Sequence, residues 1–298
     1  MRFGIQLPQA GPQVDARSIL DLARHVEDLG FDAVFVFDHL FTPTTIASRY
    51  PGSVDGSYPI SPTEPYLDAV ALLAALAATT QRVRLATRVL VPLLRPPVVL
   101  AKELTTIDQL APGRLLLGVG TGWMKEEFDS VDVGFDDRYG RLGEHLAVMR
   151  GAWASPVSAF SGRYYSHPEA GFGPQPANAR IPVVIGGFVD RSLEAVAEHG
   201  DGWAAFQPAV AGRASNAAMA PELLAARYDQ LGRRCEARGR DVRDLFMVTS
   251  ASFREEPTVL QAHARLGVDL CALVGFGSAE DIARRAERFS TEVGLEVG

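Results

Sequence analysis

Short runs of aliphatic and β-branched residues alternate along this chain with longer segments of helical periodicity. We expect eight strands from these runs, at residues 2–7, 33–37, 83–91, 115–119, 183–185, 202–206, 245–250 and 270–274. The segment 15–29 illustrates the helices between them, because its apolar residues recur every three or four positions, Asp15 can cap its start and Gly30 can end it. Eight strand–helix pairs without a Pro/Gly/Ser-rich linker predict one α/β domain over residues 1–298, a closed (β/α)8 TIM barrel rather than two open sheets.

Charge and composition limit the kinds of partner. The chain has 47% hydrophobic and 22% charged residues, typical of a globular protein, and a formal net charge of -7. Without clustered Lys and Arg, nucleic acid and anionic membranes are poor partners, so we expect a small-molecule substrate. The start lacks a secretory signal, and the longest apolar run, residues 67–78, is shorter than the roughly 20 residues of a bilayer span. Cys235 and Cys271 lack the spacing of a zinc or redox site, which predicts reduced thiols in a cytoplasmic protein, with a disulfide as the alternative.

Two long segments interrupt the alternation. Residues 40–65 are rich in Pro, Ser, Thr and Tyr, and residues 154–181 in Pro, Gly and aromatic residues. Loops of this length in a compact domain are usually functional, because ordering them has an entropic cost that a short linker avoids. We therefore expect inserted loops at the C-terminal barrel face that act as lids or substrate walls.

A histidine follows the second predicted strand. Asp38 and His39 come directly after the apolar run 33–37, and barrel enzymes place reactive groups at the C-terminal ends of strands. The alternative is a histidine that only bonds a neighbouring loop. The strand-end position favours a catalytic role for His39.

Glycines end two other predicted strands. The run 118–122 resembles a dinucleotide-binding loop, but Trp123 stands where the third glycine would be needed, so we reject a Rossmann site. Gly120 and Gly122 would still let a flat ring or a phosphate approach the backbone. Gly186 and Gly187 precede a predicted helix, whose free N–H groups could bind a phosphate. Tight turns are the alternative at both places.

Several other site classes have no support in the sequence. The first strand has no His-x-His pair, and neither H-E-x-x-H nor G-x-S-x-G occurs, which argues against metal and serine chemistry. No predicted strand contains a lysine, which weakens a Schiff-base mechanism.

The order and spacing of several motifs from the first strand to about residue 203 resemble the luciferase-like monooxygenase family, and within it the F420-dependent oxidoreductases. The motifs that carry the resemblance are Phe3-Gly4-Ile5, Gly30-Phe31-Asp32, Phe37-Asp38-His39, Ala47-Ser48-Arg49-Tyr50-Pro51, residues 83–89, Ala101-Lys102-Glu103-Leu104, Gly113-Arg114-Leu115, residues 118–123, Gly162-Arg163-Tyr164-Tyr165, Ile185-Gly186-Gly187 and Gly200-Asp201-Gly202-Trp203. The C-terminal third is similar only in general pattern.

The resemblance implies a TIM barrel that binds a ring cofactor, coenzyme F420 or FMN, at its C-terminal face, and often a homodimer. It implies that Asp38 and His39 flank the ring, with His39 as the catalytic residue. A cis peptide within Thr87-Arg88-Val89, expected between Arg88 and Val89, would support the ring. The cofactor phosphate would bind at Gly186, Gly187 and Phe188. Trp123, Phe41 and Phe206 are the aromatic residues that we expect in the substrate pocket.

Two departures from the sugar-phosphate dehydrogenases of this family argue against glucose-6-phosphate as substrate. Those enzymes have a Trp shortly after the Asp-His pair and a Glu after the fourth-strand glycines, where this chain has Phe41, Thr42 and Pro43, and Trp123. His39 is then the only acid–base candidate carried over.

Three functions remain open from the sequence. The first is an F420-dependent oxidoreductase, in which a hydride moves between C5 of the deazaflavin and the substrate while His39 exchanges a proton. The second is an FMN-dependent monooxygenase of the same family, and the third is a barrel that binds the cofactor without catalysis.

Overall fold

Eight parallel strands form a closed barrel in the computed structural model, which describes residues 1–209 and 217–296. Around the barrel the strands follow chain order, and β1 closes it by pairing with the last strand through Phe3 and Cys271. The strands are β1 (Arg2–Gln6), β2 (Ala33–Val36), β3 (Arg84–Thr87), β4 (Leu115–Val119), β7 (Val183–Gly186), β8 (Gly202–Ala204), β9 (Phe246–Ser252) and β10 (Leu270–Val274). All eight overlap the predicted runs, so the TIM-barrel prediction is confirmed.

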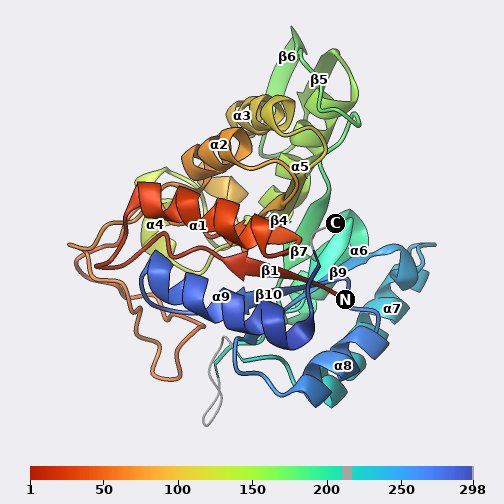
Figure 1. Cartoon of the computed structure of the whole chain (residues 1–298). Helices are drawn as coiled ribbons and strands as arrows, with labels where there is room; N and C mark the ends of the chain where they lie inside the picture. The colour runs from red at the N-terminus through yellow and green to blue at the C-terminus, as the bar shows by residue number, and fades with distance from the viewer. Residues whose placement is uncertain (210–216, 297–298) are drawn as a thin grey trace.

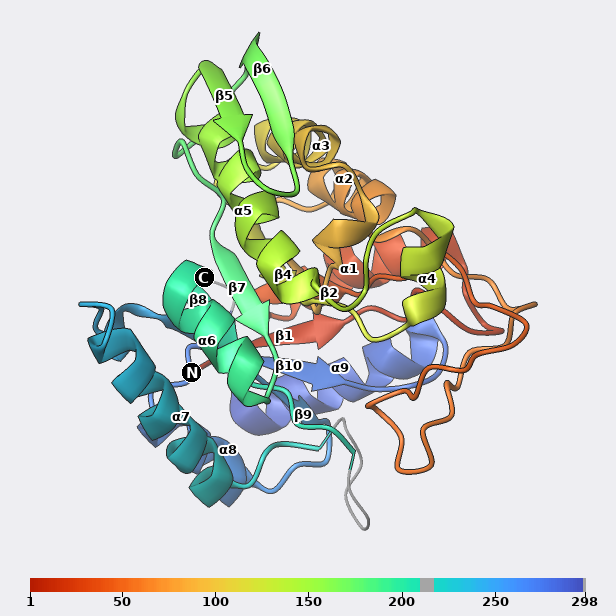
Figure 2. The ribbon, with the colours of Figure 1, turned by 180° about the vertical axis from the view of Figure 1, so that it is seen from behind.

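Helices surround the barrel on its outer side (Figures 1 and 2). They are α1 (Ala16–Asp28), α2 (Ala69–Thr79), α3 (Pro97–Leu110), α5 (Arg138–Ala154), α6 (Asp190–His199), α7 (Pro221–Glu236), α8 (Pro257–Arg265) and α9 (Ala279–Val293). Asp15 caps α1 as predicted, because its carboxylate accepts a hydrogen bond of 2.7 Å from the Ser18 N–H. The larger core lies between the strands and these helices.

The barrel interior is filled by a smaller cluster with an arginine towards each end. Residues of alternate strand positions make this cluster, among them Ala33, Phe35, Ala86, Leu116, Val184, Ala204, Val248, Leu270 and Ala272. Arg84 and Arg88 are four residues apart on the β3 segment and share a face with Ala86. Arg84 lies over the ring of Phe246 at the N-terminal end, and Arg88 lies over Phe206 at the C-terminal end.

The two long segments follow elements of different kinds, the first a strand and the second a helix. Residues 40–65 follow β2 and therefore lie at the C-terminal end, as predicted. Residues 154–181 connect the end of α5 to the start of β7, and contain the hairpin β5 (Val157–Ser161) and β6 (Ser166–Gly171). Gln109, near the end of α3, donates a hydrogen bond of 2.9 Å to the Gln175 carbonyl. The hairpin runs back along α5, because Arg141 in the first turn of α5 lies over the Tyr164 ring and the Tyr165 ring lies 5.5 Å from that of His145. The role of this segment as a lid stays a prediction.

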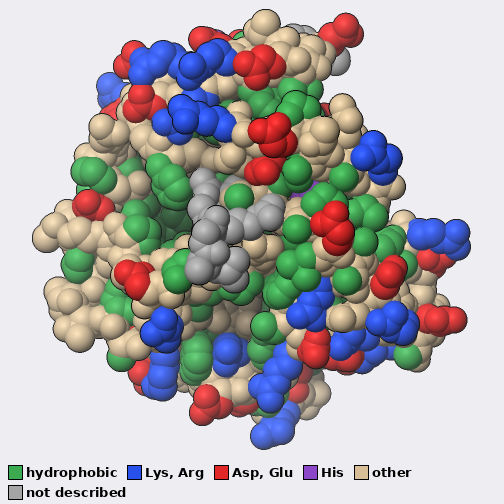
Figure 3. Space-filling view, turned by 90° about the horizontal axis from the view of Figure 1, so that it is seen from below, with side chains coloured by type: hydrophobic (Ala, Val, Ile, Leu, Met, Phe, Trp, Pro, Cys, Tyr) green, Lys and Arg blue, Asp and Glu red, His purple; other side chains and the backbone are tan. Residues whose placement is uncertain are grey.

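A different insertion, which the sequence did not indicate, lies at the C-terminal end of the barrel. The connection from β4 to α5 contains the short helix α4 (Lys125–Ser130), and a 3-10 turn, η1 (Pro92–Leu94), follows β3. The 40–65 loop extends towards the lower side of the molecule in Figure 1. Figure 3 shows this face from below, where apolar side chains border a hollow.

Two smaller predictions concern cysteines and membrane spans. Cys235 and Cys271 are free and buried, as expected of reduced core residues. Within the described residues, we find no helix that combines the length and apolar character needed to cross a bilayer.

Candidate active site

His39 and Glu127 form a buried pair at the C-terminal end of β2. The His39 Nδ1 lies 2.8 Å from the Glu127 Oε2, and their side chains are only 9% and 2% exposed. The other Glu127 oxygen accepts a hydrogen bond of 2.6 Å from the Leu40 N–H. Within the described chain His39 Nε2 has no hydrogen-bond partner, and it remains accessible. Because a carboxylate on Nδ1 places a proton there, Nε2 is free to accept or donate a proton towards a ligand.

Glu127 is the functional residue that the sequence analysis missed. His39 is therefore not the only acid–base group, since a carboxylate lies in contact with its ring. Glu127 lies in the first turn of α4, next to Glu126, whose carboxylate accepts hydrogen bonds from Ala47 N (2.6 Å) and from Ser48 N (3.1 Å). Two adjacent acidic residues shortly after the fourth-strand glycines were the available signal. Together they attach the 40–65 loop and the histidine to α4.

The Asp38 carboxylate forms a buried ion pair with Arg95. Arg95, which follows η1, binds it bidentately at 2.8 and 2.9 Å, and the Val91 N–H donates to it at 3.0 Å. The Asp38 side chain is fully enclosed, and Arg95 also binds the more exposed Asp68 at 2.7 Å. Burial alone would lower the pKa of Arg95, but the hydrogen bonds and charges of Asp38 and Asp68 outweigh it and raise the pKa. This raised pKa keeps the Arg95 guanidinium protonated. A direct contact of Asp38 with a cofactor stays a prediction, and one that this arrangement does not favour.

Aromatic side chains enclose His39. The ring centroids of Tyr58, Trp123 and Tyr66 lie 5.1, 5.5 and 5.8 Å from the imidazole, and Tyr50 contacts both Tyr58 and Trp123. Burial raises the pKa of Tyr58 and Tyr66, which keeps both phenols protonated. The residues come from the 40–65 loop, from just beyond it and from the end of β4. This part of the loop therefore forms a wall beside the histidine.

The other two predicted pocket residues lie apart from this aromatic wall. Phe41 is 39% exposed and makes no ring contact with another described residue. Phe206 is half-buried under Arg88. Their contact with substrate remains a prediction.

The Arg88–Val89 peptide is cis, as predicted. Two of the strand-end glycines make room for the Val89 side chain. A Cβ at Gly120 or Gly186 would lie only 2.7 or 2.8 Å from a Val89 methyl group. The Thr87 hydroxyl donates a hydrogen bond of 2.6 Å to the Gly118 carbonyl. Packing between neighbouring strand ends thus explains Gly120 and Gly186 without a ligand.

The turn after β7, where we expect the cofactor phosphate, has fewer free backbone N–H groups than the sequence predicts. The Gly187 N–H donates to the Ala204 carbonyl at 3.1 Å, so it is already used within the barrel. Gly187 has φ +142°, and a Cβ there would lie 2.5 Å from the Ser192 Cβ. Any phosphate at this turn would have to bind the N–H groups from Phe188 onwards.

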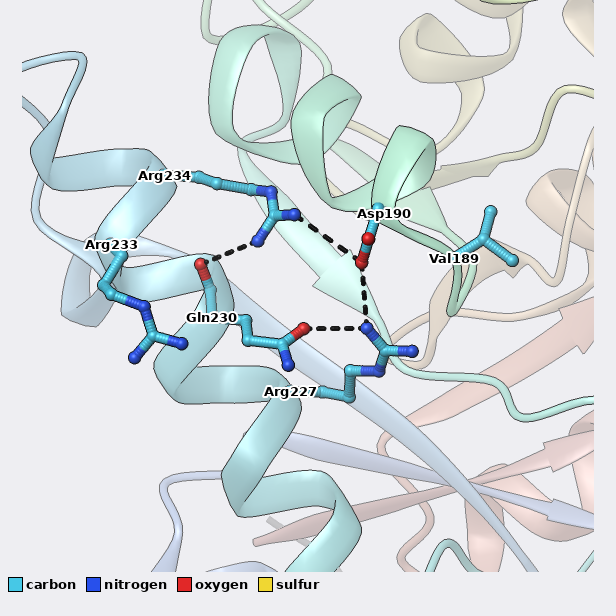
Figure 4. A pocket seen from close by; sticks show the side chains of 6 residues that line it. All are labelled: Val189, Asp190, Arg227, Gln230, Arg233 and Arg234. Atoms are coloured by element: carbon cyan, nitrogen blue, oxygen red, sulfur yellow. Dashed lines mark hydrogen bonds and ion pairs between the residues drawn. The ribbon is translucent and has the colours of Figure 1, made fainter.

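A groove of about 580 Å³ lies beside this turn, on the outside of the barrel (Figure 4). Its arginines come from α7, and Asp190 at the start of α6 faces them. Asp190 pairs with Arg227 at 3.0 Å and with Arg234 at 3.5 Å, and Arg227 lies over the ring of Phe188. The residues that line it are Val189, Asp190, Arg227, Gln230, Arg233 and Arg234. Much of its positive charge is thus neutralised within the protein.

A closed parallel barrel with a histidine–carboxylate pair at its C-terminal end has the architecture of a barrel enzyme. The family model described as luciferase-like monooxygenase matches residues 1–288, so the chain belongs to this family.

Relatives within the family differ in cofactor and reaction. The chain is 33% identical over 192 residues to an F420-dependent glucose-6-phosphate dehydrogenase of Microbacterium testaceum, a match that covers 62% of this chain and 51% of that enzyme. Proteins of Mycobacterium tuberculosis and Mycobacterium bovis that are 32% identical over 182 residues are matched over 64% of their length, so the chain spans less than two thirds of these relatives. Two solved structures share the fold. The monooxygenase RslO1 from Streptomyces bottropensis has a TM-score of 0.75 at 21% identity, covering 98% of both chains. An F420-dependent secondary alcohol dehydrogenase, in complex with an F420–acetone adduct, has a TM-score of 0.74 at 17% identity, covering 100% of this chain and 99% of the other.

Proposed function

We propose that this protein is an F420-dependent oxidoreductase that transfers a hydride between the deazaflavin and a small organic substrate. The observation that carries the proposal is the His39–Glu127 pair, with an accessible Nε2 inside an aromatic wall at the C-terminal barrel end. This arrangement suits proton exchange with a substrate and argues against a barrel that only binds a cofactor.

The residues around the barrel mouth fit a flavin-type cofactor. Arg88 has a buried Nε without an acceptor, and the half-buried rings of Trp123 and Phe206 lie on the same end of the barrel. Arg88, Val89 and the turn at Phe188 would hold the cofactor. When bound, F420 or FMN supplies a ring that gives or accepts a hydride.

The roles of the other residues follow from their contacts. His39 exchanges a proton with the substrate, and Glu127 orients the imidazole. The Asp38–Arg95 pair holds the end of β2 against the segment after β3, which keeps His39 in place. The aromatic wall limits the access of water to the reacting groups.

FMN-dependent monooxygenation is the second candidate. Its support is the fold similarity to a monooxygenase, which is as high as that to an F420-dependent dehydrogenase. Equilibrium binding of purified protein to F420 and to FMN separates the two. The proposal expects F420 to bind more tightly and to be reduced by a member of a panel of secondary alcohols. Binding of FMN alone would overturn it in favour of the monooxygenase.

The cofactor phosphate is expected at the start of α6, and Val189 offers a test of that position. Val189 is 51% exposed at the N-cap of α6, where Asp and Asn both cap well. Val189→Asp places a negative charge beside the phosphate and should weaken binding of F420 or FMN about tenfold or more, while Val189→Asn should not. Riboflavin, which lacks the phosphate, serves as the control ligand. Equal affinities of the Asp and Asn variants for FMN would place the phosphate elsewhere, with the Gly120–Gly122 turn as the next candidate. Gly187→Val is a poorer test, because its Cβ would clash with Ser192.

A homodimer and a cytoplasmic location remain predictions. Light scattering of the purified protein would test the first.

A further inference from the structure

Arg88 is a cation at the C-terminal end of the barrel interior without an ion-pair partner among the described residues. Its Nη1 donates a hydrogen bond of 2.6 Å to the Gln6 Oε1, and its guanidinium lies 4.4 Å from the centre of the Phe206 ring. The Nε is buried and has no acceptor. The side chain as a whole is half-buried, so part of it remains accessible. Most of its five N–H donors are therefore unused.

A buried guanidinium without a counter-charge is costly, because the protein replaces only part of its hydration. Burial lowers the pKa of Arg88 to about 10, with Tyr50 and Cys271 opposing the shift, and the group stays protonated at neutral pH. Arg84, at the other end of the same segment of β3, lies near the carboxylates of Asp32 and Asp269. In the part of the chain that the structure describes, Arg88 has no such carboxylates nearby, which indicates that its counter-charge comes from a ligand.

Arg88 is connected to the candidate active site through Tyr50. The phenol of Tyr50 and the guanidinium of Arg88 are close enough to affect each other's pKa, and the Tyr50 ring packs 5.0 Å from that of Trp123, which contacts His39. A ligand that touches both Arg88 and the aromatic wall would therefore extend towards His39.

We propose that Arg88 binds the negatively charged edge of the reduced cofactor ring and so favours the reduced over the oxidised form. This inference rests on the proposed function. Reduced flavin and reduced deazaflavin carry a negative charge shared by N1 and the C2 oxygen, two neighbouring acceptors that suit the planar fork of an arginine. The Gln6 side-chain amide, held by Arg88, offers a further donor beside it.

The consequence concerns the direction of the reaction. The hydride that leaves the substrate brings two electrons to the ring and leaves the ring with a negative charge, which Arg88 compensates. His39 takes the proton that the substrate releases. A fixed cation thus raises the midpoint potential of the bound cofactor and favours oxidation of the substrate over its reduction.

Three variants test the assignment. Arg88→Met removes the charge at similar volume, and Gln6→Glu supplies a carboxylate beside the unchanged arginine. Arg84→Met is the matched control, because it removes an arginine of the same segment and interior face at the opposite end of the barrel. Affinities for oxidised and reduced FMN and F420, and the midpoint potential of each complex, are measured against a reference dye.

We expect Arg88→Met and Gln6→Glu each to weaken binding of the reduced cofactor about tenfold relative to the oxidised form, which lowers the midpoint potential by about 30 mV for a two-electron couple. Arg84→Met should leave the potential unchanged. Gln6→Glu keeps the test decisive if Arg88→Met folds poorly.

Equal losses of affinity for both redox forms, or unchanged potentials, would overturn the proposal. It would also be overturned if Arg88→Met kept the potential but lost binding of benzoate, since the arginine would then recognise a substrate carboxylate. Failure of the wild-type protein to bind either cofactor would instead refute the proposed function.

Discussion

Each end of the barrel interior carries a phenylalanine with arginine over its ring, but the surroundings differ, and at the N-terminal end Arg2 lies over Phe246 as well as Arg84. At the N-terminal end Arg84 lies over Phe246 near Asp32 and Asp269, and these carboxylates also accept hydrogen bonds from the Phe3 and Met247 N–H groups, at 3.0 and 2.8 Å. Carboxylates therefore lie near the arginines at this end. At the C-terminal end, Arg88 has unused donors. The N-terminal end is built for stability, whereas the C-terminal end leaves groups that a ligand can complete.

Two buried glutamates repeat this contrast. Glu27 of α1, near the N-terminal end, accepts hydrogen bonds from the N–H groups of Gln81, Arg82 and Val83. Burial alone would raise the pKa of Glu27, but these donors outweigh it and the pKa is lowered. Glu127 shares its oxygens between one backbone N–H and the imidazole of His39. The first glutamate ties the backbone together, and the second serves a side chain with a free nitrogen.

The largest effect is expected from His39→Ala. Loss of a general acid or base should slow turnover by roughly 10²- to 10⁴-fold and leave cofactor binding nearly intact, because the residues proposed to hold the cofactor are Arg88, Val89 and the turn at Phe188. Turnover is followed by cofactor absorbance with the best substrate of the screen. Unchanged turnover would remove the catalytic role from this end of the barrel.

Asp38→Ala should act on stability. It leaves Arg95 without its buried partner, and breaking such a pair costs about 3–5 kcal/mol. Denaturant unfolding measures the change, with Asp68→Asn as the control. Asp68 is the N-cap of α2, a role that asparagine can keep, and its side chain is 46% exposed, so its ion pair should contribute about 1 kcal/mol or less. Equal losses in the two variants would contradict the special role of the buried pair.

Exchanging each buried glutamate for glutamine compares the two ends directly. Glu127→Gln should reduce turnover by about 10- to 100-fold, the value of a charge-assisted hydrogen bond, and should affect kcat more than KM. Glu27→Gln should lower the unfolding free energy without changing kcat. The comparison fails if Glu27→Gln slows turnover as much as Glu127→Gln does.

The smallest effect concerns pH. His145 of α5 is buried, its Nε2 lies 3.1 Å from the Arg95 carbonyl, and burial lowers its pKa from 6.5 to about 4. The unfolded chain therefore binds a proton between about pH 6.5 and 4 that the folded protein does not, so stability falls as the pH falls through this window. The loss is at most about 1.4 kcal/mol per pH unit. The unfolding free energy, measured at pH 7 and pH 5, should fall with pH in the wild type and fall less in His145→Gln. The same fall in both proteins would assign the pH dependence to other groups.

The sequence alone determined the eight strands, the N-cap at Asp15, and the position of Asp38 and His39 at a strand end. Local periodicity and backbone sterics determine such features, because they involve residues close along the chain. The cis bond after Arg88 was found only through resemblance to a known family.

Only the tertiary structure decided the partners of these residues. Glu127 reaches His39 across 88 residues, and Arg95 reaches Asp38 across 57. Several carboxylates and arginines near the barrel mouth were equally plausible in the sequence. Which of them meet depends on how the β4–α5 connection and the segment after β3 pack once the barrel closes. Among the described residues, the same closure leaves Arg88 without a nearby carboxylate, since chain position alone carries no information about contacts between distant segments.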